Sequence, residues 1–144
     1  GHSLGAAVGT LAMLRLGALG FQVRLSHLFE SPRVGNEKFA TVFDQEFARQ
    51  IPMFRITHAR DPVPHLPPEY SVVSKYKHVN FEVFYERNGS WRFCPAQEDP
   101  SCADRYFLPD TLPFVEDHCA TPLALQGNIC HCPVPRAGQE AIVV

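Results

Sequence analysis

The sequence has no run of about 20 apolar residues, the length that a helix needs to cross a membrane. The apolar stretch that follows Ser3 is shorter, and Arg15 interrupts it. Neither charge sign dominates, because 13 basic residues face 15 acidic ones and the formal net charge is −2 at pH 7. This balance gives no electrostatic reason to expect nucleic acid or an anionic membrane as a partner.

The sequence also lacks the two C-x-x-C pairs that are typical of a structural zinc site. Cys130 and Cys132 are separated by a single residue, and no second pair exists. We therefore expect no bound metal. An initiator Met, a recognisable targeting segment and internal repeats are absent as well, which we interpret as a chain whose N-terminal part is missing.

The length and composition fit one globular domain. The chain has 144 residues, of which 45% are hydrophobic, which is enough to bury a core. We assign residues 1–132 to this domain, and we expect residues 133–144, with Pro133, Pro135 and Gly138, to form a flexible tail. Cys94 and Cys102 bracket a polar loop that a disulfide closes easily, which points to an oxidising compartment. The odd count of five cysteines leaves at least one free or paired outside this chain.

The pentapeptide Gly-His-Ser-Leu-Gly at positions 1–5 is the main chemical motif. Gly-x-Ser-x-Gly followed by an apolar helix is typical of a nucleophile elbow, in which a strained turn exposes the serine. We expect Gly1 and Gly5 to avoid collisions that a Cβ atom would cause. The helix N-terminus then points at Ser3, and the amide of Leu4 is placed to bind an oxyanion. The strand that precedes such an elbow is absent from the sequence, so we expect the backbone of Ser3 to lack its support.

Helix and strand patterns alternate after the elbow. The spacing predicts a buried helix over 4–19, a strand over 21–29, an amphipathic helix over 36–50 and a strand over 53–57. Strand, helix and strand joined by short links predict an α/β fold with parallel strands and a crossover helix. Residues 77–85 and 90–93 flank an Asn-Gly pair, which predicts a β-hairpin.

A serine nucleophile needs a base and an acid that orients the base, and the sequence supplies both downstream. Asp61 lies just past the predicted strand over 53–57, and His118 lies in a predicted loop or short helix. The resulting order, serine then aspartate then histidine, is that of α/β-hydrolases. We expect structural or surface roles for the other histidines and for the competing aspartates: His2, His27, His58, His65, His78, His131, Asp44, Asp99, Asp104, Asp110 and Asp117.

Five segments in order resemble the class 3 lipases, a fungal triacylglycerol-lipase-like group of the α/β-hydrolase superfamily. They are the elbow at 1–5, Ser-Pro-Arg-Val-Gly-Asn at 31–36 with Phe39-Ala40, Arg-Asp-Pro-Val-Pro-His-Leu-Pro-Pro at 60–68, Tyr-Lys-His at 76–78 with Glu82-Val83, and Asp-His at 117–118. The resemblance covers 1 to about 130 and implies the C-terminal half of an α/β-hydrolase fold. It also implies that Ser3 is the nucleophile, Asp61 the acid and His118 the base.

By the same resemblance, we expect the parent protein to hydrolyse lipid esters at a lipid–water interface without a cofactor and to be secreted. Cys94 and Cys102 resemble a short-loop disulfide of secreted members, and Cys130 resembles a cysteine that pairs with the family's N-terminal region. The family's lid and second oxyanion donor lie before Gly1, so we expect weak activity from this chain alone. Phospholipid, galactolipid, cutin-like and feruloyl esters remain open as substrates. The alternative from another class is a non-catalytic remnant that binds lipid or a protein partner.

Overall fold

The computed structural model describes residues 1–47, 53–70, 75–120 and 130. Its helices and strands follow one another along the chain as α1 (Leu4–Ala18), β1 (Ser26–Phe29), β2 (Gly35–Asn36), α2 (Glu37–Phe47), β3 (Met53–His58), η1 (Val63–His65), β4 (Tyr76–Lys77), β5 (Glu82–Tyr85), β6 (Trp91–Cys94), η2 (Ala103–Arg105), α3 (Leu108–Thr111) and η3 (Leu112–His118).

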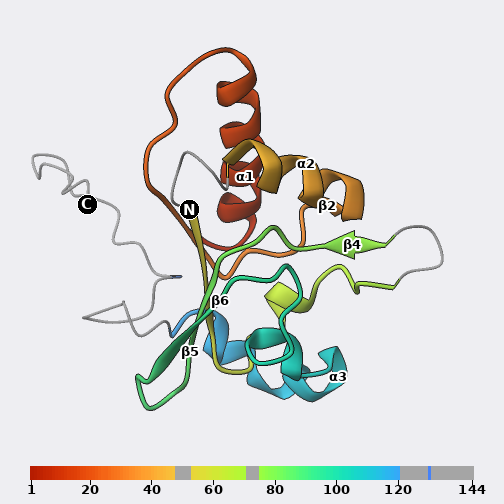
Figure 1. Ribbon diagram of the computed structural model, residues 1–144. Coiled ribbons are helices and arrows are strands. Elements are labelled where there is room, and N and C mark those ends of the chain that lie inside the picture. The colour runs from red at the N-terminus through yellow and green to blue at the C-terminus, as the bar shows by residue number, and fades with distance from the viewer. Residues whose placement is uncertain (48–52, 71–74, 121–129, 131–144) are drawn as a thin grey trace, which may run out of the picture.

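Four strands form the main sheet, in the order β1-β3-β5-β6 (Figure 1). β1 and β5 both pair with β3 in parallel, and β6 pairs with β5 in antiparallel. The α/β class and the parallel strands with a crossover helix are therefore confirmed. The predicted hairpin is also confirmed, since β5 and β6 flank the turn at Asn88-Gly89. β2 and β4 form a separate two-stranded ribbon.

The crossover helix α2 forms where the 3.6-residue pattern predicts it. Asn36 caps its first turn, since the Asn36 Oδ1 accepts a hydrogen bond from the backbone N–H of Phe39 at 2.9 Å. Ala40, Phe43 and Phe47 share one buried face of the helix. The rings of Phe43 and Phe47 lie 4.7 Å apart, in the hydrophobic core that α2 forms with α1 and β1.

The first helix, α1, is less buried than the sequence predicts. Only Ala6, Thr10 and Met13 are buried, whereas Leu4, Val8, Leu11 and Leu16 are exposed. The physical reason is that α1 packs against β1 and the core on one side only, so apolar side chains on its other sides remain outside. The prediction of a helix buried on nearly every face is wrong for this chain.

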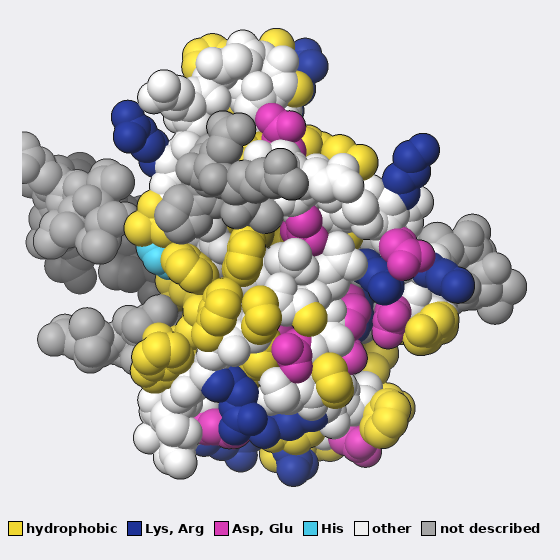
Figure 2. Space-filling view, viewed as in Figure 1, with side chains coloured by type: hydrophobic (Ala, Val, Ile, Leu, Met, Phe, Trp, Pro, Cys, Tyr) yellow, Lys and Arg dark blue, Asp and Glu magenta, His cyan; other side chains and the backbone are white. Residues whose placement is uncertain are grey.

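The main sheet likewise has one covered and one open face. Alternating residues put Leu28, Arg55 and Phe84 on the face beneath the helices and loops. The opposite face presents a shallow apolar groove lined by His27, Phe54, Ile56, Val83, Tyr85, Trp91 and Phe93. Figure 2 shows hydrophobic side chains gathered in a patch near β5 and β6 on one side of the molecule.

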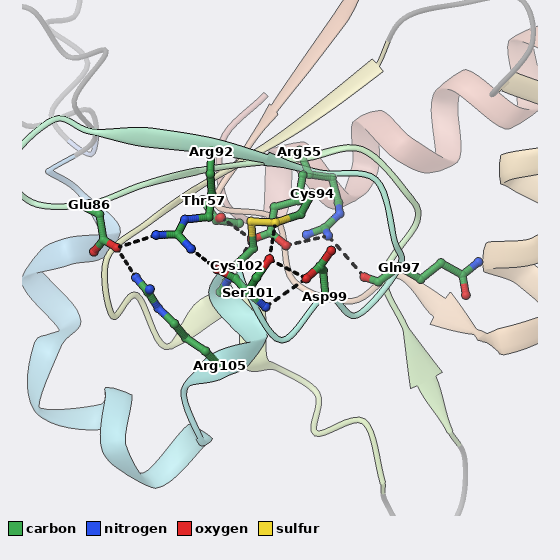
Figure 3. The surroundings of a disulfide bond; sticks show 12 residues. Arg55, Thr57, Glu86, Arg92, Cys94, Gln97, Asp99, Ser101, Cys102 and Arg105 are labelled. Atoms are coloured by element: carbon green, nitrogen blue, oxygen red, sulfur yellow. Dashed lines mark hydrogen bonds and ion pairs between the residues drawn. A yellow bond between two sulfur atoms is a disulfide. The ribbon is translucent and has the colours of Figure 1, made fainter.

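Two disulfides join neighbouring parts of the second half. The predicted Cys94–Cys102 bond is present and closes the loop after β6, where the Ser101 hydroxyl donates to Asp99 at 2.7 Å (Figure 3). The second bond joins Cys119 to Cys130. The expectation that Cys130 pairs with a missing N-terminal region is therefore wrong, because Cys119 lies close enough to be its partner. Cys132 and the predicted tail over 133–144 lie outside the described residues.

Candidate active site

The pentapeptide at positions 1–5 is held in a strained turn between α1 and β1. Ser3 has φ of 57°, in the left-handed region, and α1 begins at the next residue. The Ser3 N–H donates to the Phe29 carbonyl at 2.9 Å, and the Phe29 N–H donates to the Gly1 carbonyl at 2.8 Å. His2 thus forms a parallel bridge with Phe29. The expectation of an unsupported Ser3 is wrong, because β1 itself binds the residues on both sides of His2.

The two glycines of the motif differ in what a side chain would meet. A Cβ atom on Gly1 would lie 2.5 Å from the Gly5 carbonyl oxygen, so the helix start excludes any larger residue. A Cβ atom on Gly5 would meet nothing within 4 Å in the described structure. The steric expectation is confirmed for Gly1 and wrong for Gly5.

Asp61 lies at the carboxyl end of β3, where parallel sheets collect functional residues. Its side chain is 2% exposed, and its Oδ1 accepts a hydrogen bond from the Val63 N–H at 2.8 Å. Side chains of His78 and Arg33 hold the loop that follows Asp61. The buried His78 ring donates through Nε2 to the Pro64 carbonyl at 2.7 Å, which is a structural role as expected. Arg33 donates to the Pro67 carbonyl at 3.2 Å.

His118 ends η3, a 3-10 segment held by its other side chains. The buried Asp117 carboxylate accepts hydrogen bonds from the Arg87 guanidinium at 2.9 Å and from the Arg60 N–H at 3.1 Å. The guanidinium carbons of Arg60 and Arg87 lie 4.9 and 4.8 Å from the centre of the Phe114 ring. These contacts fix the backbone at the end of η3. The position of His118 is therefore set by neighbouring residues of η3 as well as by its own hydrogen bonds.

The structure brings Ser3, Asp61 and His118 together. The His118 Nδ1 lies 2.7 Å from the Asp61 Oδ2, and the His118 Nε2 lies 2.8 Å from the Ser3 Oγ. Since an ionised carboxylate only accepts, Nδ1 carries the proton, which leaves Nε2 of a neutral imidazole free to accept from the hydroxyl. This geometry permits His118 to remove the Ser3 proton as the hydroxyl attacks.

The N–H of Leu4 is the fourth candidate feature. Leu4 is the first residue of α1, so its N–H has no acceptor within the helix and lies at the positive end of the helix dipole. The Leu4 side chain is exposed.

Sequence reasoning missed the contact between His2 and His118. The two rings lie 4.6 Å apart, and the His2 Nε2 donates to the His118 carbonyl at 2.8 Å. Burial lowers the pKa of His2, and the hydrogen bond to the His118 carbonyl raises it by a smaller amount. Only the position of His2 beside the nucleophile signals the contact in the sequence.

The remaining candidates lie outside this arrangement. The His58 Nδ1 donates to the Asp117 carbonyl at 3.2 Å, a scaffold role as expected. His65 is a buried residue of the loop after Asp61, and burial with the nearby Arg33 charge lowers its pKa to about 4. Asp44 is half-buried instead of fully exposed, because it accepts hydrogen bonds from the Asn80 N–H and the Gln97 amide.

Neither a metal site nor a membrane span is found where the structure describes the chain. No group of three or more His, Cys, Asp or Glu side chains in the described ranges is arranged to hold a metal ion. None of the described helices has the length and apolar character needed to cross a bilayer.

The fold and site together define the class of protein. The sheet has parallel strands with a crossover helix, and the strained Ser3 lies before α1 and beside the end of β1. These features are typical of the α/β-hydrolase fold, and this chain forms part of such a fold. The model of the class 3 lipase family matches residues 1–71. The chain is thus class 3 lipase-like, in agreement with the resemblance in its motifs.

The similar curated proteins are secreted lipases from fungi. The chain is 42% identical over 86 residues to secreted mono- and diacylglycerol lipase 1 of Fusarium solani, covering 60% of this chain and 24% of the relative. It is 37% identical over 102 residues to secreted mono- and diacylglycerol lipase MDL2 of Malassezia globosa, covering 69% of this chain and 32% of that protein. The chain therefore spans between a quarter and a third of these relatives.

Solved lipase structures share the fold. Lipase II from Rhizopus niveus superposes with a TM-score of 0.70 at 28% identity, over 91% of this chain and 48% of its own. Lip2 lipase from Yarrowia lipolytica superposes with a TM-score of 0.68 at 27% identity, over 83% of this chain and 44% of its own. Two disulfides and relatives named as secreted agree with the predicted extracellular localisation.

Proposed function

We propose that this chain carries the catalytic triad of a serine ester hydrolase that acts on lipid esters. The observation that carries the proposal is the continuous hydrogen-bonded path from Ser3 through His118 to Asp61, with distances of 2.8 and 2.7 Å. A serine activated in this way attacks a carbonyl, and the oriented imidazole moves the proton. The positive φ of Ser3 supports the nucleophile role, because backbone strain concentrates at active sites.

The reaction follows from these contacts. His118 takes the Ser3 proton as the Ser3 Oγ attacks the ester carbonyl, and the N–H of Leu4 binds the oxyanion. His118 then gives the proton to the leaving alcohol, which leaves an acyl group on Ser3. Water, activated by His118, attacks this acyl ester and releases the fatty acid. Asp61 keeps the Nδ1 proton in place throughout. No cofactor takes part in these steps.

The lipid nature of the substrate is supported by the surroundings of the site. Large exposed apolar side chains occur on the segments that carry the triad: Leu4 follows Ser3, and Leu112 and Val115 lie on η3 before His118. The similar fungal proteins are named mono- and diacylglycerol lipases. We therefore propose acylglycerols at a lipid–water interface as the substrate class. Hydrolysis of acylglycerol emulsions, measured beside phosphatidylcholine and methyl ferulate, separates this class from phospholipase and feruloyl-esterase alternatives.

Covalent labelling by a fluorophosphonate probe tests the nucleophile directly, even if turnover is slow. We expect one label per chain, on the peptide that contains Ser3. Ser3→Ala abolishes labelling, whereas Ser90→Ala, at an exposed position in the hairpin turn, leaves it unchanged. Mass spectrometry of the labelled chain and its peptides gives the readout. A folded wild-type chain that takes up no label would overturn the proposal and favour a non-catalytic remnant.

A further inference from the structure

Glu30 is an unusual residue for its place. It directly follows β1, is 0% exposed, and has φ of 50°, in the region that favours glycine. Its own N–H continues the parallel ladder by donating to the Ile56 carbonyl at 2.8 Å, so the backbone cannot easily relax. A buried carboxyl and a left-handed backbone each cost free energy. Because Glu30 carries both costs, we looked for a function of its side chain among its contacts.

The contacts of Glu30 point to Asp61. The Glu30 Oε2 accepts a hydrogen bond from the His58 N–H at 3.2 Å. The Glu30 Oε1 is buried and has no donor among the described groups. The Asp61 N–H donates to the His58 carbonyl at 3.1 Å, so the Glu30 carboxyl, bound to the His58 N–H, lies against the turn that carries Asp61. The charge of Asp61 and a hydrogen bond to it are among the causes that raise the pKa of Glu30. Two carboxylates cannot bond to each other when both are ionised, so a proton held between them would satisfy the unpaired oxygen.

The donors around the two carboxyls decide which one keeps that proton. Asp61 receives the Val63 N–H at 2.8 Å and the His118 Nδ1–H at 2.7 Å. From the described part of the chain, Glu30 receives only the longer bond from the His58 N–H. Hydrogen-bond donors favour the charged form of a carboxyl, so the negative charge is better stabilised on Asp61.

We propose that Glu30 is a positioning residue, protonated at neutral pH, whose carboxyl O–H donates to the Asp61 carboxylate and holds it toward His118. The inference rests on the proposed function, because Asp61 matters here as the acid of the triad. The side chain of Glu30 does not contact the reacting atoms. It acts through Asp61, in the way that outer hydrogen bonds fix the orientation of functional groups.

The charges that face Glu30 favour the neutral form. Burial raises the pKa of Glu30 well above its ordinary value, and the charge of Asp61, a hydrogen bond to Asp61 and the charge of Glu82 on β5 raise it further. The bond from the His58 N–H on β3 lowers the pKa by a smaller amount. When the pH rises above the pKa of Glu30, two adjacent carboxylates repel each other, and Asp61 loses its donor.

The protonation state can be measured without any catalytic assay. In the full chain labelled with ¹³C at the glutamate Cδ, we expect one carboxyl resonance at the protonated position at pH 7. Glu30→Gln removes this resonance, whereas the exposed Glu46→Gln leaves it in place. If the resonance assigned to Glu30 lies at the ionised position at pH 7, the inference is wrong, whatever the chain hydrolyses.

Labelling of Ser3 tests the positioning role. Glu30→Gln keeps a neutral donor, so we expect labelling within about twofold of wild type at pH 7 and no alkaline fall caused by a titrating residue 30. Glu30→Gly removes the donor and relieves the positive φ, so we expect a folded chain that labels roughly tenfold more slowly or worse. A wild-type rate for Glu30→Gly, or an unchanged alkaline fall in Glu30→Gln, would overturn the positioning role. Failure of the wild-type chain to label would instead contradict the proposed function.

Discussion

At the scale of single residues, the site depends on which atom carries each proton. The Asp61 carboxylate accepts from the His118 Nδ1, so the Nε2 that faces Ser3 is left as the acceptor. The carbonyl of His118 accepts from His2, whose ring also packs on the His118 ring. The histidine is thus oriented through both its side chain and its backbone.

Asp61→Asn tests the orienting role of the acid. An amide can present its NH₂ group to His118, which favours the wrong tautomer while the shape of the side chain is kept. We expect fluorophosphonate labelling of Ser3 to slow by about 10³- to 10⁴-fold, as in other serine triads. Rate constants of labelling at pH 7 give the measurement, with the exposed Asp110→Asn as the matched control. A loss smaller than tenfold would mean that Asp61 does not orient the base.

At the scale of elements, the two disulfides occupy different places relative to the site. Cys94–Cys102 closes a short loop after β6, with a sequence separation of 8. Cys119–Cys130 begins at the residue that follows His118 and η3. Loss of either cross-link gives the unfolded chain more freedom, but only the second is attached to the segment that carries the histidine.

We therefore expect different results from the paired variants Cys94→Ala/Cys102→Ala and Cys119→Ala/Cys130→Ala. The first should lower the free energy of unfolding by about 2 to 3 kcal/mol and leave Ser3 labelling of the folded chain within about twofold. The second should lower stability by a similar amount and also slow labelling, because His118 loses the restraint on its C-terminal side. Denaturant unfolding and labelling rates measure the two effects. Equal labelling by both variants would contradict this assignment.

At the scale of the whole molecule, buried titratable groups link stability to pH. His65 is 5% exposed, and its pKa is lowered from 6.5 to about 4 in the folded chain. As the pH falls, His65 therefore becomes protonated at a higher pH in the unfolded chain than in the folded chain. The resulting stability is fully present above pH 6.5 and is lost as the pH falls toward 4. Asp104 acts in the opposite sense, since burial raises its pKa to about 6 and acid pH favours its folded form.

His65→Gln isolates this contribution. Between pH 7 and pH 5 we expect the wild-type chain to lose about 2 kcal/mol more of its free energy of unfolding than the variant loses. Urea unfolding at both pH values gives the comparison, and His27→Gln, on the exposed face of β1, serves as the control. The prediction fails if His65→Gln and wild type show the same change with pH, because His65 would then not be buried as a neutral ring.

Local patterns in the sequence determined most of the elements. The apolar spacing of Ala40, Phe43 and Phe47 is confirmed in α2, and Asn88-Gly89 is confirmed as a hairpin turn. Strand ends were less well predicted. The strand expected over 21–29 is reduced to Ser26–Phe29, because pairing with β3 begins only at Ser26. Side-chain periodicity does not report where a partner strand starts.

The sequence by itself determined the α/β class, the Cys94–Cys102 pair and the candidates Ser3, Asp61 and His118, because each depends on local spacing or on order along the chain. Tertiary structure alone decided the support of Ser3 by Phe29, the pairing of Cys119 with Cys130, and the approach of Glu30 to Asp61. The physical reason is that these contacts join residues from different elements. Their distances depend on how β1, β3 and η3 pack together, which no local pattern contains.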